Sequence, residues 1–304
     1  MKNKKVSLVI VLVVALSLFS VTILAFSGNQ DNYEALKKVM MASEHFENGT
    51  FNGHLTITDN SKVLLDAKVI GKADHVSENV SGKVILNIED ITKSAEFYKE
   101  GQKAYFVDKD NELYYQVDDI EDHKTSHHNR NHFKGKDSRE MSKAEEELVD
   151  FMMGDIKEQI KLSVDENGTK AFSIDLTENE IPVPIKLLLT KGILDNDHMS
   201  KTSDDDEKYE AIHQLPFFNG LEEAHNNFPV ITDNVKVNHI LISVKIDAED
   251  KIIAHEFSLT VEGTDVSGKA HTTTIDGSLL LNEVNSTVVD TLDLTGKDVK
   301  ILKK

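Results

Sequence analysis

The chain has 304 residues, and its 53 Asp and Glu outnumber its 34 Lys and Arg, which gives a formal net charge of -19 at pH 7. Such an acidic chain repels nucleic-acid phosphates and anionic lipid head groups, so nucleic-acid binding is excluded. Because cysteine is absent, disulfide bonds and a cysteine-linked lipid anchor are excluded as well.

An uncharged segment at residues 6–26 follows three lysines near the start of the chain. At about 1.5 Å per residue, this segment is long enough for a helix that crosses a hydrocarbon core of about 30 Å, so the sequence predicts a single transmembrane anchor. By the positive-inside rule, residues 1–5 are then cytoplasmic and residues 27–304 extracytoplasmic, with the protein in the cell membrane. A cleaved signal peptide is the alternative, because residues 25–27 fit a small-x-small cleavage site.

The first part of the exported region predicts one helix and then a run of strands. Apolar residues recur at three- and four-residue steps over residues 31–46, which is typical of a helix. From residue 55 the period changes to two, and Asp59-Asn60-Ser61 supplies turn residues, which predicts a β-hairpin over 55–70. Four more short strands are expected up to residue 117, which completes a six-stranded antiparallel meander.

The middle of the chain alternates charged loops with helices. Residues 121–141 carry many charges and no hydrophobic period, so we expect a mobile loop there. The capping sequence Ser142-Lys143-Ala144-Glu145 then predicts a helix with an apolar stripe that docks on a sheet. The stripe consists of Leu148, Phe151, Met152, Ile156 and Ile160. A strand at 170–176 and a helix at 185–194 follow.

The last hundred residues predict a helical stretch and then about four more strands. The final two, at 271–281 and 288–294, contain few large apolar residues and more threonine, as expected at an edge or a solvent-facing wall of a sheet. All these elements together predict an α+β domain at 27–304. In it a curled antiparallel sheet of about 10–11 strands forms an open half-barrel against packed helices, behind one N-terminal transmembrane helix.

Sequence motifs for enzyme chemistry are incomplete. Residues 263–269 have the spacing of a phosphate-binding loop, but Ala270 replaces the Ser or Thr whose hydroxyl would hold magnesium. The segment that follows predicts a strand, whereas such a loop needs a helix. No hydrolase motif and no cysteine nucleophile is present, so we expect no enzyme activity and no cofactor.

The best candidate for a metal site is a cluster of four histidines, His123, His127, His128 and His132. Neutral imidazoles suit zinc, copper and nickel ions. Against a specific site, the spacing matches no known ligand pattern and two basic residues stand among the histidines, so a solvated linker is the simpler interpretation. The acidic segments 204–207 and 108–112 lack the glycine and the terminal glutamate of a helix-loop-helix calcium site.

The order of elements resembles the half-barrel group that contains the outer-membrane lipoprotein carrier LolA and LppX. The resemblance is architectural and covers nearly all of residues 31–304. It implies an open sheet curled around helices, with an apolar concavity that holds an acyl chain, and it carries over no site residues. The missing lipidation cysteine and the long apolar segment depart from periplasmic carriers, which suggests a surface-tethered bacterial relative.

We therefore expect a non-enzymatic, membrane-anchored protein of the bacterial envelope that binds a lipid, another hydrophobic ligand or an envelope protein. One alternative is an extracytoplasmic sensing or protein-interaction domain without a small-molecule ligand, and another is metal binding through the histidines. Leu65 and Phe257 are the side chains that we expect to line an open cavity. If the apolar helix stripe fills this cavity, no ligand fits.

Overall fold

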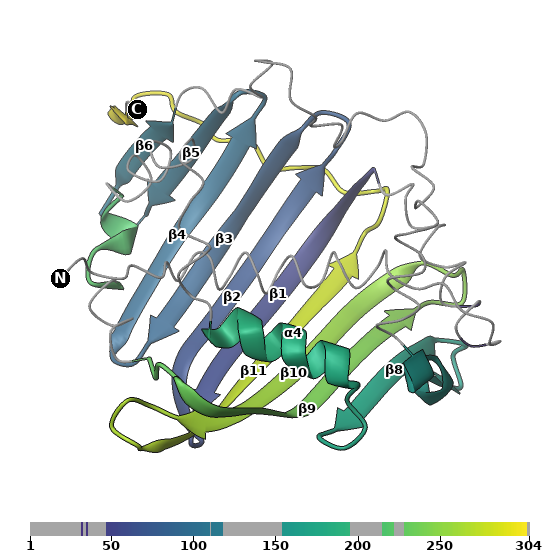
Figure 1. Cartoon of the computed structure of the whole chain (residues 1–304). Coiled ribbons are helices and arrows are strands. Elements are labelled where there is room, and N and C mark those ends of the chain that lie inside the picture. The colour runs from purple at the N-terminus through teal and green to yellow at the C-terminus, as the bar shows by residue number, and fades with distance from the viewer. Residues whose placement is uncertain are drawn as a thin grey trace, which may run out of the picture.

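The computed structural model describes Asn32, Ala35 and residues 47–109, 111–117, 154–194, 215–221 and 228–302. These residues form one sheet of twelve strands in the order β12-β6-β5-β4-β3-β2-β1-β11-β10-β9-β8-β7 (Figure 1). The strands are β1 (Asn48–Asp59), β2 (Lys62–Asp74), β3 (Asn79–Ile88), β4 (Ile91–Glu100), β5 (Lys103–Asp108), β6 (Leu113–Val117), β7 (Lys161–Val164), β8 (Lys170–Thr177), β9 (Asp233–Ile246), β10 (Ile252–Thr264), β11 (Ala270–Asn282) and β12 (Val299–Leu302). All neighbours are antiparallel except β12 and β6.

Alternating side chains give the sheet one apolar face. In β1, Leu55 and Ile57 are 7% and 4% exposed, whereas His54 is exposed. Because successive residues of a strand point to opposite faces, this period gathers the apolar residues on one side. The helix α4 (Val183–Leu194) lies over β9 on that side, which faces the viewer in Figure 1 and which we call the front face.

Three hairpin turns share one local design based on an aspartate. In each turn the aspartate Oδ1 accepts the backbone N–H groups two and four residues later, at distances of 2.8–3.0 Å. The aspartates are Asp165, Asp247 and Asp265. The third residue after each has a positive φ, for example 82° at Gly268, which suits glycine and is tolerated by aspartate. The same short-range chemistry therefore closes the β7–β8, β9–β10 and β10–β11 hairpins.

The core on the front face consists of three clusters of buried side chains. The first lies over β8, β9 and β10 and includes Phe172, and Ile185 and Leu189 of α4 pack against it. The second lies over β1, β2 and β3 and includes Leu65, against which Phe217 and Phe218 of the short 3-10 helix η3 (Pro216–Phe218) also pack. The third joins β6 to β12 and consists of Tyr115, Val117, Leu215 and Leu302. A further 3-10 helix, η2 (Gly154–Gln159), contributes Ile156 to the first cluster.

Residues 283–298, which we call the C-terminal strap, connect β11 to β12 across the opposite face of the sheet. In Figure 1 the strap passes behind the upper part of the sheet. It contacts one strand after another through the pairs Thr287–Thr50, Asp290–Lys72, Asp290–Ser81, Leu292–Glu100 and Lys297–Tyr114. The strap brings β12 to the edge of the sheet in the same direction as β6, which makes the sheet mixed.

The predicted fold class is wrong. Where the sequence indicated an antiparallel half-barrel against packed helices, the described residues form a mixed sheet of twelve strands with one complete α-helix. Two physical reasons account for the difference. The strap carries the last strand across the sheet, and α4 has only 12 residues, which cover the β9 side alone.

The predicted transmembrane helix and signal anchor are also corrected. In the part of the chain that the structure describes, no helix is long and apolar enough to cross a membrane. Residues 6–26, for which the anchor was predicted, lie outside the described residues, as does the predicted loop at 121–141.

We predict that Ser81→Ala weakens the attachment of the strap. Ser81 is 1% exposed, and its Oγ accepts the backbone N–H of Asp290 at 3.0 Å. Without this acceptor the N–H group is left unpaired against the sheet, so the free energy of unfolding in urea should fall by about 1–3 kcal/mol. Ser258→Ala, at a half-buried serine on the same face of β10, is the control and should change it by less than about 0.5 kcal/mol. Equal effects of the two substitutions would contradict the prediction.

Candidate functional site

Four glycines interrupt the apolar front face of the central strands. Gly82 of β3 is paired with Gly71 of β2, and Gly53 of β1 and Gly277 of β11 continue this line obliquely across the sheet. A glycine inside a strand removes a side chain from the sheet surface and marks a place where another group comes close to the backbone. The four glycines therefore form an oblique line across four neighbouring strands, along which no side chain of their own projects from the front face.

A side chain from an adjacent strand covers each glycine. The pairs are Phe97 over Gly82, Val69 over Gly53, Phe51 over Gly71 and Phe257 over Gly277. A Cβ atom added to Gly82 would lie 2.5 Å from Cζ of Phe97, and one added to Gly53 would lie 2.7 Å from Cγ1 of Val69. The covering side chains are thus held down against the backbone, where any larger residue would push them away.

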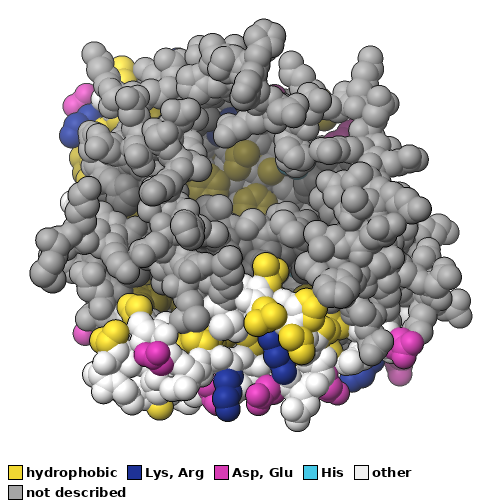
Figure 2. Space-filling view, in the orientation of Figure 1, with side chains coloured by type: hydrophobic (Ala, Val, Ile, Leu, Met, Phe, Trp, Pro, Cys, Tyr) yellow, Lys and Arg dark blue, Asp and Glu magenta, His cyan; other side chains and the backbone are white. Residues whose placement is uncertain are grey.

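Beside the buried clusters, these pairs form a patch of half-buried apolar side chains that we call the aromatic floor. It consists of Phe51, Val69, Val84, Phe97 and Leu279, with the glycines at 53, 71 and 82 between them. In the space-filling view, hydrophobic side chains are visible near the centre of the front face (Figure 2). The floor is therefore an apolar surface whose side chains are half-buried rather than fully enclosed.

The immediate surroundings of the floor carry little free charge. His255 lies beside Leu279 in the pairing of β10 with β11, and burial lowers the pKa of its imidazole, which favours the neutral form. Lys99 also lies on the front face, at the upper end of β4, where its Nζ donates to the carbonyl oxygen of Glu78 at 3.0 Å. The floor is consequently suited to an uncharged, apolar group.

A polar pocket lies further along β4, where β4 extends past the end of β5. Its volume is about 280 Å³, and its lining includes Lys93, Asp108, Asn111, Phe217 and Asn219. The backbone N–H and the side-chain Nδ2 of Asn111 donate to the Asp108 carboxylate at 3.1 and 2.8 Å. Sequence reasoning placed Asp108 in a hairpin turn; it is the last residue of β5, directly before the turn to β6. Lys93 was not singled out.

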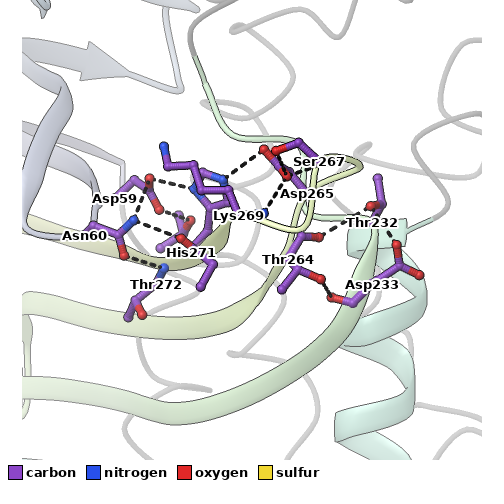
Figure 3. A network of polar contacts seen from close by, with 12 residues as sticks. Asp59, Asn60, Thr232, Asp233, Thr264, Asp265, Ser267, Lys269, His271 and Thr272 are labelled. Carbon is purple, nitrogen blue, oxygen red and sulfur yellow. Dashed lines mark hydrogen bonds and ion pairs between the residues drawn. The ribbon is translucent and has the colours of Figure 1, made fainter.

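A second polar cluster joins the β1–β2 turn to the β10–β11 turn (Figure 3). The buried imidazole of His271 contacts Asp59 Oδ2 through Nδ1 at 2.8 Å, and its Nε2 lies 3.5 Å from Asp265 Oδ2. Ser267 Oγ donates to Asp265 at 2.7 Å and not to the imidazole. Among the described residues, no hydroxyl is therefore arranged with His271 as a nucleophile with its base. The cluster holds the β1–β2 and β10–β11 turns together.

The residues singled out from the sequence are only partly placed by the structure. The segment 263–269 ends β10 and forms a hairpin turn, so it is not a phosphate-binding loop between strand and helix. His123, His127, His128 and His132 lie outside the described residues, as do residues 204–207. In the described ranges, no group of three or more His, Asp or Glu is placed to hold a metal ion.

The two side chains expected to line a cavity differ in their surroundings. Leu65 is 0% exposed within the second core cluster, whereas Phe257 is half-buried over Gly277. Sequence reasoning missed the aromatic floor, although its signal was present, because glycines stand at apolar-face positions inside segments that alternate as strands. No protein-family model matches the sequence, and no curated protein matches it.

Substitutions at the glycines test the aromatic packing. We predict that Gly277→Ala lowers the free energy of unfolding by about 1–3 kcal/mol, because the new methyl group overlaps the ring of Phe257. Adding Phe257→Leu should recover part of this loss, since the three atoms nearest to that position all belong to Phe257. Gly82→Ala is the matched case, because the backbone oxygen of Ile70 lies 2.6 Å from its added Cβ and removal of Phe97 would not relieve it. Purely additive energies at positions 277 and 257 would contradict the packing.

The turn at Asp265 predicts a specific dependence of stability on pH. Hydrogen bonds from the Ser267 hydroxyl and from the backbone of Lys269 and Ser267 lower the pKa of Asp265 to about 2. Because its folded pKa lies below the unfolded value, Asp265 stabilises the fold above about pH 4, and this contribution disappears as the pH falls through about 2. Chemical unfolding of wild type and Asp265→Asn should show a constant difference from pH 7 to 5 that shrinks toward pH 2. A difference that does not change with pH would contradict the assignment.

Proposed function

We propose that the protein is a non-enzymatic binder of the acyl chain of a lipid-like molecule, which lies on the aromatic floor. The observation that carries the proposal is the line of strand glycines covered by side chains from neighbouring strands. Because the glycines have no side chains and the covering side chains lie against the backbone, the front face across β3, β2 and β1 is apolar with few projecting groups. A long, narrow, apolar group suits such a surface better than a compact polar one.

The energetics of apolar contact support this choice of ligand. Each methylene group that leaves water for an apolar surface contributes about 0.8 kcal/mol, so several such groups give measurable affinity without any hydrogen bond. The aromatic rings of Phe51 and Phe97 offer flat faces, and both side chains are still half-buried rather than fully enclosed. A chain that covers them would remove this remaining apolar surface from water.

The contacts of His271 and His54 agree with the non-enzymatic role that we propose. His271 is enclosed between two turn aspartates, and the described part of the chain gives it no hydroxyl partner. His54 contacts Asp66 at 3.0 Å on the opposite face, and its other contact is the hydroxyl of Thr56 at 3.3 Å. Both histidines connect strands or turns, which is a structural role.

The resemblance to the lipoprotein carrier group stays a proposal, as do the export of the chain and its place in an envelope. All three agree with a binder of lipid acyl chains. An exported protein of a bacterial envelope would encounter such a ligand in the membrane.

Neighbouring leucines on β11 provide a matched test. Leu279 lies on the front face within the aromatic floor, whereas Leu280 is 48% exposed on the opposite face. In isothermal titration calorimetry with the uncharged single-chain amphiphile decyl maltoside, kept below its micelle concentration, Leu279→Asn should weaken binding about tenfold, which corresponds to about 1.4 kcal/mol. Leu280→Asn should bind like wild type.

Two results would contradict the proposed function. One is the absence of binding by the full-length wild-type chain. The other is an equal effect of the two substitutions, provided that circular dichroism shows both variants to be folded. The second result would assign the ligand to a surface other than the aromatic floor.

A further inference from the structure

The pocket where β4 extends past the end of β5 is lined by one positively and one negatively charged side chain. Lys93 and Asp108 both line it, yet they form no ion pair with one another. Some other lysines of the described chain are paired, for example Lys62 with Glu89, Lys72 with Asp290, Lys109 with Glu96 and Lys245 with Glu256. Lys93 has no such partner among the described residues, although its side chain is half-buried.

The two charges are held in different ways. The Asp108 carboxylate is fixed by two hydrogen bonds from Asn111, and these use only part of its capacity as an acceptor. Lys93 carries three N–H donors on a flexible chain, so it can meet an anion at varied positions. Phe217 lies in the pocket wall, and an aromatic ring attracts an ammonium group placed over its face.

We propose that this pocket binds the zwitterionic head group of the lipid, with its phosphate at Lys93 and its ammonium group between Asp108 and Phe217. The inference rests on the proposed function, because it assigns the polar end of the molecule whose acyl chain lies on the aromatic floor. A volume of about 280 Å³ suits a head group and is too small for a whole lipid.

The pocket and the floor lie on the same strand and the same face. Phe97, Ala95 and Lys93 alternate along β4 and point to the front face. At about 3.3 Å per residue, Lys93 lies about 13 Å from Phe97 along the strand. A head group at Lys93 therefore places the start of an acyl chain about 13 Å from Phe97 of the floor, with the buried Ala95 between them along the front face of β4.

The charge of the whole chain favours a zwitterion over an anion. A formal net charge of -19 repels any ligand that brings a further negative charge. Inside the pocket, the carboxylate of Asp108 repels the phosphate of a ligand. If the ligand also carries an ammonium group, the carboxylate attracts that group. A phosphoethanolamine head group satisfies both charges, whereas a phosphoglycerol head group satisfies only Lys93.

The test compares two short-chain lipids that differ only in the head group. Dihexanoyl phosphatidylethanolamine and dihexanoyl phosphatidylglycerol are titrated as monomers into the full-length chain by isothermal titration calorimetry. Wild type should bind the ethanolamine lipid at least about tenfold more tightly than the glycerol lipid. Lys93→Gln and Asp108→Asn should each remove most of this preference, and Lys83→Gln, at an exposed lysine on the opposite face of β3, should keep it.

Further arms separate the head group from the chain. Glycerophosphoethanolamine, which has no acyl chain, should bind weakly to wild type and more weakly still to Lys93→Gln. Decyl maltoside should bind wild type and Lys93→Gln equally. Equal affinity of wild type for the two dihexanoyl lipids, with decyl maltoside still bound, would overturn the head-group site and leave the proposed function standing. Loss of decyl maltoside binding in wild type would overturn both.

Discussion

Continuous hydrogen bonding between neighbouring strands is the constraint on which the rest of this structure depends. Because twelve strands are joined edge to edge, the register of each pair decides which residues share a face and which lie in one row across the sheet. The register of β2 with β3 sets Gly71 opposite Gly82, and the pairs on either side bring Phe51 and Phe97 next to them. A shift of one residue in any of these pairs would move the aromatic rings to the opposite face.

The two faces of this wide sheet are covered in different ways. On the front face, apolar clusters are covered by α4 and η3, and the aromatic floor lies beside them. On the opposite face, polar side chains dominate, and the strap crosses them through side-chain hydrogen bonds and ion pairs. Burial thus stabilises one side, and the other side stays polar enough to be exposed.

Local patterns predicted the elements better than their arrangement. The hairpin expected at 55–70 is confirmed as β1 and β2, with Asn60 and Ser61 at positive φ in the turn, and the six-stranded meander is confirmed as β1 to β6. The predicted helix at 185–194 corresponds to α4. These elements depend on interactions between residues close in sequence, which is why alternation and turn residues reveal them.

The errors arise where distant segments meet. The threonine-rich strand at 271–281 was expected at an edge or a solvent-facing wall. It is not at an edge, because β11 pairs with β1 and β10 near the middle of the sheet, and Thr272 and Thr274 face the polar side, where Thr274 contacts Thr260 at 3.1 Å. The strand expected at 288–294 is the strap instead, whose backbone N–H groups at Asp290 and Leu292 bond to side chains and not to a ladder. Neither the pairing of β1 with β11 nor the pocket at Lys93 is visible from local periodicity.

Isotope-filtered nuclear Overhauser measurements can show directly whether an acyl chain lies on the aromatic floor. With labelled Phe and Leu side chains and unlabelled decyl maltoside, we expect contacts from the acyl methylene protons to the rings of Phe51 and Phe97 and to the methyl groups of Leu279. Leu280, on the opposite face, should show none. Contacts confined to Leu280 or to other side chains of the opposite face would show that the acyl chain does not lie on the aromatic floor.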